Sequence, residues 1–319
     1  MYTDIIRLSP IFKEKVWGGS SLHTNFDYDI PSDHTGECWG IASHPSGSST
    51  ITNGPLTGWT LMDAWMEHKK ELFNEDNDEK AFPLLIKILD ANDDLSVQVH
   101  PNDAQAHELE DNEAYGKTEC WYIVDCKDGS EIVLGHHAKT RAELEDYIEK
   151  GDWDGLLRRV PVKPGDFFFV PAGTIHAIGE GIVILETQQN SDTTYRVYDY
   201  DRRDDQNQTR ELHLDKAVEV TTIPDEKQEN AFSYQNVHDL SITTLTENDF
   251  FSVFHLDLDG IYEGSRPADY LLATIIEGEV TFTGKDTHLL KKGDHFILPY
   301  ELENFKLEGT AKAIVSYPK

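Results

Sequence analysis

The chain is poor in cysteine, since its 319 residues include only Cys38, Cys120 and Cys126, with no CxxC spacing. Neither a disulfide framework nor a thiolate metal site is therefore expected, and the pattern fits a reducing cytoplasm. Long hydrophobic runs are also missing, because no apolar stretch approaches the roughly 20 residues that span a bilayer. The opening residues, MYTDIIRLSP, lack the basic and apolar regions of a signal peptide. We expect a soluble cytoplasmic protein.

Positive charge is scarce as well, with 28 Lys and Arg against 59 Asp and Glu and a formal net charge of −31. The electrostatic field of so negative a protein repels nucleic acids and anionic membrane surfaces, so neither is an expected partner. An anionic substrate would have to be attracted by a few local cations. Hydrophobic residues reach 38% and aromatic residues 10%, enough for a core in a chain of two-domain length.

Strand-like segments dominate the chain. The continuous apolar run AFPLLIKILDA and the later segments ECWYIVDC and SEIVLG are typical of strands. Helices are expected over residues 60–80, 103–115 and 139–150, where Thr60 and Thr140 occupy N-cap positions. The pattern indicates helices inserted among the strands of the first half.

An internal repeat indicates two similar β units. The segment VKPGDFFFVP at residues 162–171 recurs as LKKGDHFILP at 290–299, with Lys, Gly, Asp, Phe and Pro in register. The first copy continues as PAGTIH, which completes G-x5-P-x-G-x2-H, the second motif of the cupin barrels, at His176. We therefore predict a mainly β protein of two cupin (double-stranded β-helix) barrels, residues 1–225 and 240–319, with helical insertions in the N-terminal half.

The stretch DDLSVQVHP places polar residues at alternate positions before a proline. Because side chains alternate along a strand, Ser96, Gln98 and His100 are expected on one face. The other face would carry the apolar residues Leu95, Val97 and Val99. By itself such a pattern usually marks a solvated face, and a metal role needs partners elsewhere in the chain.

Those partners are present if the cupin motif forms. Gln98 and His100 would combine with Glu119, at the head of the next strand, and with His176. Two imidazoles, a carboxylate and an amide oxygen form a set that holds Zn²⁺ with room for water or substrate, although Mn²⁺, Fe²⁺ or Co²⁺ would also fit. We expect one zinc ion per chain in an open catalytic site. His136, which follows a turn, is interpreted as a surface or loop residue.

Several longer segments resemble one enzyme family. They are KEKVWGG, TGECWGIASH, FPLLIKILDANDDLSVQVHP, GKTECWYIV, PAGTIHAI and ILETQQNSDTTYRVYDYDR. Together they resemble the type I mannose-6-phosphate isomerases, in particular the short bacterial form, over nearly the whole chain. The resemblance implies that the four donors bind zinc. It also implies interconversion of D-mannose 6-phosphate and D-fructose 6-phosphate through an enediol intermediate.

The resemblance also implies roles for residues outside the metal set. Arg196, Glu186 and Lys87 are expected to be catalytic, with either Glu186 or a zinc-bound hydroxide as the base. From its position alone, Lys87 could equally extend along the barrel wall to the rim. The residues expected to contact the sugar phosphate are Ser96, Lys117 and Asp192.

Two departures from the family pattern accompany these expectations. Longer members carry a lysine shortly after the arginine, where this chain has YDYDRR, which leaves open whether Arg202 replaces that lysine. Asn304 stands where the second repeat would need its histidine, so the second barrel is expected to be metal-free. Alternative functions are a non-catalytic, regulatory sugar-phosphate-binding cupin and a metal-dependent dioxygenase, although Gln98 argues against the latter. The oligomeric state is expected to be a monomer or a homodimer.

Overall fold

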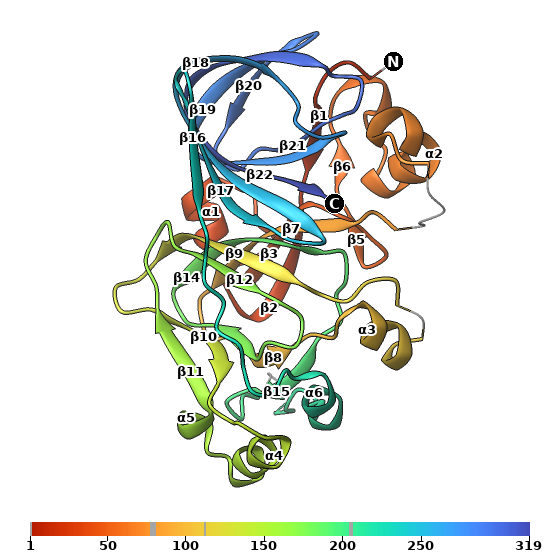
Figure 1. Ribbon diagram of the computed structural model, residues 1–319. Coiled ribbons are helices and arrows are strands. Elements are labelled where there is room, and N and C mark those ends of the chain that lie inside the picture. Colours follow the sequence, from red (N-terminus) through yellow and green to blue (C-terminus); the bar gives the residue numbers. More distant parts are fainter. Residues whose placement is uncertain (1, 77–80, 112, 204–206) are drawn as a thin grey trace.

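The protein is mainly β, as a computed structural model that describes residues 2–76, 81–111, 113–203 and 207–319 shows (Figure 1). Two antiparallel sheets form the lower half of the view, and a nine-stranded sheet forms the upper half. The short strands β4 (Ser43–His44) and β5 (Gly47–Ser48) pair separately. In the part of the chain that is described, no helix is long and apolar enough to cross a membrane.

Two sheets of the N-terminal region enclose a shared core. The six-stranded sheet has the order β12 (Phe167–Val170), β9 (Glu119–Cys126), β14 (Ile182–Gln189), β7 (Leu84–Ala91), β3 (Thr35–Ile41) and β2 (Ile11–Gly19). The five-stranded sheet has the order β11 (Leu157–Pro161), β10 (Glu131–His136), β13 (His176–Ile178), β8 (Val97–Val99) and β15 (Tyr195–Tyr198). Trp121 and Ile184 of the first sheet join Ile132 and Ile178 of the second in one hydrophobic cluster. The two sheets therefore pack face to face.

The nine-stranded sheet combines both ends of the chain. Its order is β16 (Ser233–Val237), β17 (Leu240–Glu247), β18 (Phe251–Ser265), β22 (Asn304–Pro318), β19 (Leu271–Thr283), β21 (His295–Leu298), β1 (Ile6–Ser9) and β6 (Thr50–Ile51), with β20 (Thr287–Lys291) on β19. Two N-terminal strands thus extend the C-terminal sheet. Within the described ranges the strand order of each sheet is open, so the pairing gives cupin-type sheets without confirming two closed barrels.

Every described helix precedes residue 225. The helices are α1 (Ser21–Phe26), the 3-10 helix η1 (Gly54–Leu56), α2 (Leu61–Phe73), α3 (Asp103–Leu109), α4 (Arg141–Lys150), α5 (Trp153–Leu156) and α6 (Leu214–Val220). Thr60 caps α2 as predicted, but the helix ends well before residue 80 because Asn74 adopts a left-handed conformation with φ 58°. Helix α3 likewise ends before residue 115, whereas α4 has its predicted Thr140 cap and ends at residue 150 as predicted, although it begins at Arg141 and not at 139.

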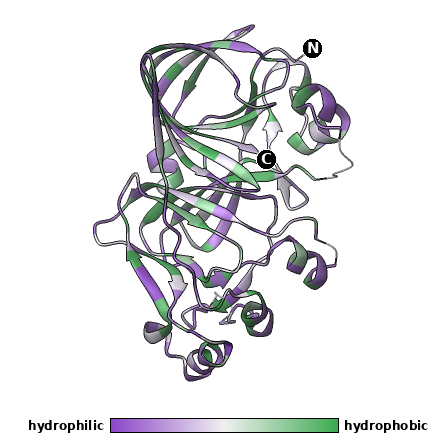
Figure 2. Cartoon of the chain, in the orientation of Figure 1, coloured by the Kyte–Doolittle hydropathy of each residue, from purple (hydrophilic) through white to green (hydrophobic). Residues whose placement is uncertain are grey.

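The six-stranded sheet is covered on both faces. Its outer face packs against the nine-stranded sheet and α2 in the largest hydrophobic cluster, which includes Ile86, Leu185, Leu272 and Ile314. All eight residues of β7 are consequently buried, which explains its continuous apolar sequence. In Figure 2 the hydrophobic residues follow the strands of the packed sheets, whereas α4 is mostly hydrophilic. A charged residue of β7 that faces the inner side must therefore lie inside the protein.

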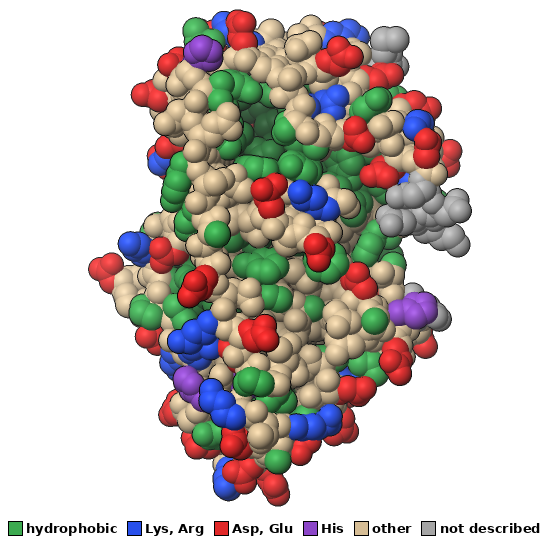
Figure 3. Space-filling view, viewed as in Figure 1, with side chains coloured by type: hydrophobic (Ala, Val, Ile, Leu, Met, Phe, Trp, Pro, Cys, Tyr) green, Lys and Arg blue, Asp and Glu red, His purple; other side chains and the backbone are tan. Residues whose placement is uncertain are grey.

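The described side chains that line the hollow of the C-terminal sheet are all apolar. The hollow is lined by Leu240, Leu256, Leu258, Leu271, Ala273, Ile275, Val280, Phe282, Phe296, Leu298, Phe305, Leu307, Ala311, Ala313 and Val315. Its apolar wall is visible as the green depression in the upper part of Figure 3. Groups able to perform acid–base chemistry or to bind metal must be sought between the two N-terminal sheets instead.

Candidate metal centre and adjacent polar pocket

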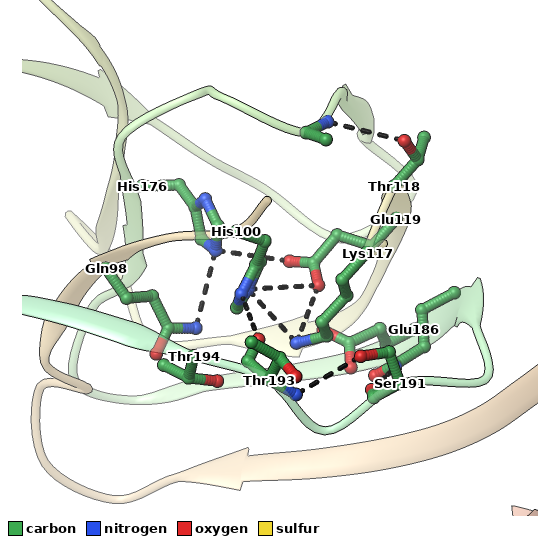
Figure 4. Close-up of polar contacts among 12 residues, drawn as sticks. Gln98, His100, Lys117, Thr118, Glu119, His176, Glu186, Ser191, Thr193 and Thr194 are labelled. Carbon is green, nitrogen blue, oxygen red and sulfur yellow. Dashed lines mark hydrogen bonds and ion pairs between the residues drawn. The ribbon is translucent and has the colours of Figure 1, made fainter. Parts of the chain in front are cut away.

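Adjacent strands bring the predicted donors together. β13 and β15 flank β8, and in this register Gln98 lies opposite both His176 and Arg196. Glu119 begins β9 in the facing sheet. The nitrogen and oxygen atoms of His100, Glu119 and His176 that could hold a metal all lie within 4.8 Å of one another. All three side chains are buried, and Figure 4 shows them pointing toward a common centre.

Backbone carbonyl groups orient the rings of His100 and His176 by contacting their Nδ1 atoms. The Nδ1 atom of His100 lies 2.8 Å from the carbonyl oxygen of Thr193, and that of His176 lies 2.8 Å from the carbonyl oxygen of Thr174. A carbonyl can only accept, so both Nδ1 atoms carry the proton and both Nε2 atoms present a lone pair. These Nε2 atoms lie 3.6 Å and 3.3 Å from the Glu119 carboxylate. The arrangement is the one that a metal-binding histidine pair requires.

Burial keeps both imidazoles neutral. It lowers the pKa of His176 to about 4, and it lowers the pKa of His100 well below its ordinary value with the help of the Lys117 ammonium group. Neutral imidazole is the form that binds metal. The Gln98 amide lies 3.4 Å from His176 Nε2 and can present its oxygen after a simple amide rotation. Donor chemistry, burial and tautomer together fit a divalent metal ion such as zinc.

Lys117 lies directly beside the donors. Its ammonium nitrogen is 2.9 Å from Glu119 Oε2 and 3.1 Å from His100 Nε2. Burial alone would lower the pKa of Lys117, but the carboxylates of Glu119 and Glu186 raise it above its ordinary value. Lys117 is therefore a fixed positive charge beside the candidate metal donors.

A row of four side chains crosses the inner face of the six-stranded sheet. Strand register aligns Trp39, Lys87, Glu186 and Trp121 on β3, β7, β14 and β9. Lys87 Nζ lies 3.6 Å from Glu186 Oε1 and 5.1 Å from the centre of the Trp39 ring. The indole N–H of Trp121 donates to Glu186 Oε2 at 3.0 Å and to Glu119 Oε1 at 3.1 Å. Lys87 is thus an inner-face residue with a buried partner, and does not extend to the rim.

The donors open into a polar pocket of about 320 Å³ between the sheets. Every predicted site residue except the fully buried His100, Glu119 and His176 lines it: Lys87, Ser96, Gln98, Lys117, Glu186, Asp192 and Arg196. The Nε of Arg196 donates to Ser96 Oγ at 3.2 Å. Leu95 also lines the pocket, contrary to the predicted alternation, because the regular strand begins only at Val97.

The sequence-based prediction missed several pocket residues. Lys15, Glu37 and Arg210 line the pocket beside the predicted residues. The alternation of Glu37 and Trp39 in TGECWGI was an available signal, since both side chains share one face of β3. One interpretation was wrong: His136 is buried in β10 and lies 3.0 Å from the Thr222 carbonyl oxygen, so it is not a surface residue.

Two face-to-face antiparallel sheets around a buried His–Glu–His group define a cupin with a candidate metal centre. A family model for the catalytic domain of type I phosphomannose isomerases matches residues 5–144. A second model, for the cupin domain of mannose-6-phosphate isomerases, matches residues 241–318. The matches therefore cover both ends of the chain.

Individual relatives agree with these matches. The chain is 51% identical over 318 residues to the mannose-6-phosphate isomerase ManA of Bacillus subtilis (strain 168), covering 99% of this chain and 100% of the relative. It is 47% identical to a mannose-6-phosphate isomerase of Streptococcus mutans over 95% of each chain. The crystal structure of a Bacillus subtilis mannose 6-phosphate isomerase superimposes with a TM-score of 0.95 at 48% identity, covering 98% and 99% of the two chains. The chain belongs to the type I mannose-6-phosphate isomerases, as the sequence motifs predicted.

Proposed function

We propose that this enzyme interconverts D-mannose 6-phosphate and D-fructose 6-phosphate in a zinc-dependent reaction that passes through an enediol intermediate. The observation that carries the proposal is the convergence of two neutral histidines and a carboxylate beside a polar pocket rich in cations. Family membership supplies the substrate pair. Residues 1–225 would form the catalytic unit, and residues 240–319 a second cupin barrel without metal.

One zinc ion per chain would be held by Gln98, His100, Glu119 and His176. When bound, zinc supplies a Lewis acid that polarises the sugar's carbonyl oxygen and stabilises the negative charge of the enediolate. Thiolates are absent from this donor set, which suits an exchangeable catalytic ion better than a closed structural one. Lys117, held 2.9 Å from Glu119, would add positive charge at the same end of the substrate.

Proton transfer between C1 and C2 requires a base, and Glu186 is the candidate within the pocket. Burial and the neighbouring Glu119 raise its pKa, while Lys117 and Lys87 moderate the increase. A carboxylate with a raised pKa is a stronger base near neutral pH. Lys87, 3.6 Å away, can hold Glu186 in place and stabilise its ionised form. The hydrogen bond from Trp121 restricts the other carboxylate oxygen.

The remaining predicted residues would contact the substrate chain. Ser96 and Asp192 line the pocket and can bind sugar hydroxyl groups, and Arg196 supplies a cation for the enediolate or the phosphate. Arginine suits either role because its planar group makes two parallel hydrogen bonds.

A coupled assay of the purified chain with mannose 6-phosphate tests the proposal. Formation of fructose 6-phosphate should disappear after chelation, return with zinc, and run in reverse from fructose 6-phosphate. The alternative, a regulatory cupin that only binds sugar phosphates, predicts no turnover from folded, zinc-loaded protein. Turnover that persists after complete metal removal would contradict the zinc dependence.

A further inference from the structure

The cations of the pocket differ in how they are neutralised. Four of the five lie within ion-pair distance of a carboxylate: Lys15 with Glu37, Lys87 with Glu186, Lys117 with Glu119 and Arg210 with Asp199. Among the described residues, Arg196 is the exception. Its Nε and Nη1 donate to Ser96 Oγ and to the Glu211 carbonyl oxygen, both uncharged. Arg196 is therefore the pocket cation at which an anion would bind without competing with an ion-paired carboxylate.

Arg210 lies beside Arg196 and is held rigidly. Its Nε donates to Asp199 Oδ2 at 2.8 Å, and its Nη2 donates to Asp199 Oδ1. This two-point contact fixes the plane of the guanidinium group and leaves its remaining donors available. Burial and the charge of Arg210 lower the pKa of Arg196, while the carboxylates of Asp199 and Glu211 act in the opposite direction. The two guanidinium groups therefore repel each other in part. A bound anion between them would relieve that repulsion.

Arg202, the candidate from sequence position, points elsewhere. Its Nη2 donates to the Asp94 carbonyl oxygen, and its Nη1 lies 3.5 Å from Asp93 Oδ2. It lines a neighbouring depression together with Arg203, and it does not line the pocket that contains Arg196. The second arginine of the pocket, beside Arg196, is therefore Arg210, which lies eight positions after Arg202.

The position of the two arginines suits the phosphate end of a sugar phosphate. Arg196 reaches Ser96, which precedes the donor Gln98 by two residues on the same chain segment. Two residues of extended chain span at most roughly 7 Å, which is comparable to the reach of a six-carbon chain from its carbonyl to its phosphate. Lys117 lies at the opposite, metal end and is already bound to Glu119.

We propose that Arg210 and Arg196 together bind the phosphate group of the substrate, and that Arg210 determines the preference for phosphorylated over unphosphorylated sugar. This inference rests on the proposed function and adds to it a residue that the sequence motifs do not indicate. A sugar phosphate carries nearly two negative charges at neutral pH, and two guanidinium groups can match them. Local pairing of this kind overcomes the repulsion expected from a chain of formal net charge −31.

The test compares Arg210→Met, Arg210→Lys and the control Arg203→Met in the full, zinc-loaded chain. Arg210→Met should raise KM for mannose 6-phosphate by roughly 10- to 100-fold, as expected for a lost charge-assisted contact, and change kcat less than about 3-fold. The KM of Arg210→Lys should lie between those of the wild type and Arg210→Met, because lysine keeps the positive charge but cannot make two parallel hydrogen bonds. Arg203 lies outside the pocket and its variant should match the wild type.

A second measurement does not depend on turnover. Calorimetric titration with inorganic phosphate should give binding to the wild type and to Arg203→Met, and binding weakened by a similar factor in Arg210→Met. A wild type that binds phosphate through Arg210 without isomerase activity would contradict the proposed function alone. Unchanged KM and unchanged phosphate affinity in a folded Arg210→Met variant would overturn this inference and leave the proposed function intact.

Discussion

Replacing Glu37 with glutamine isolates the charge of one buried pocket residue. Glu37 Oε1 lies 2.9 Å from Lys15 Nζ, and its Oε2 accepts a 2.6 Å hydrogen bond from the Trp39 indole N–H. Glutamine keeps the size of the side chain and an oxygen that can accept from Trp39. What the substitution removes is the negative charge facing Lys15 and Lys87, so it imitates a protonated Glu37.

The loss of stability expected for Glu37→Gln follows from the pKa of the Glu37 carboxyl group. Burial alone would raise it, but Lys87, Lys15 and the Trp39 hydrogen bond lower it from 4.5 to about 2. At about 1.4 kcal/mol per pKa unit, the ionised form contributes on the order of 3 kcal/mol to stability at neutral pH. Because the folded-state pKa is depressed, this contribution is complete above pH 4.5 and disappears as the pH falls through 2.

Urea denaturation of the zinc-loaded protein measures the difference. Glu37→Gln should reduce the free energy of unfolding by about 3 kcal/mol at pH 7, and the gap should narrow below pH 4.5. Glu180→Gln is the matched control, because the Lys127–Glu180 pair has the same 2.9 Å distance but side chains that are 62% and 59% exposed. Its loss should stay below about 1 kcal/mol. The reasoning would be refuted if both variants lost the same small amount of unfolding free energy. It would also be refuted if the difference between Glu37→Gln and the wild type grew as the pH fell.

Two further predictions concern histidines. In His176→Ala, elemental analysis should find bound zinc reduced from one ion per chain toward none. His136 is an equally buried histidine outside the donor set, so His136→Ala should keep its zinc. Unchanged zinc in His176→Ala would refute the donor set. Burial lowers the pKa of His295 to about 3, so between pH 6.5 and 3 only the unfolded chain protonates it. The wild type should therefore lose about 1.4 kcal/mol per pH unit on acidification that His295→Gln does not lose. Parallel slopes in urea melts at pH 7 and 5 would contradict this.

Local pattern was enough to predict much of the candidate metal centre. Alternation along DDLSVQVHP places Gln98 and His100 on one face, and the Gly–Asp and Pro–x–Gly turns direct His176 back toward them. The structure brings His100, Glu119 and His176 together as expected. These features depend on strand period and turn chemistry, which are properties of short segments. The same reasoning predicted the N-caps of α2 and α4, because capping is also local.

Pairing between distant segments was not accessible in this way. β1 joins β21 through contacts nearly 290 residues apart, so the sheet that both termini share follows from long-range register alone. The burial of His136 depends on the same kind of packing. No short window of sequence contains these partners, and neither propensity nor periodicity can supply them.

The sequence by itself determined the family, the mainly β fold and the chemical character of the donor set, because these depend on motifs and on residue type. Only the tertiary structure decided which charges of the pocket neutralise one another. Glu37 pairs with Lys15, Lys87 with Glu186, and Arg210 with Asp199, whereas Arg196 has no carboxylate within ion-pair distance among the described residues. The physical reason is that Coulomb interactions depend on distance and burial, and both are properties of the folded chain.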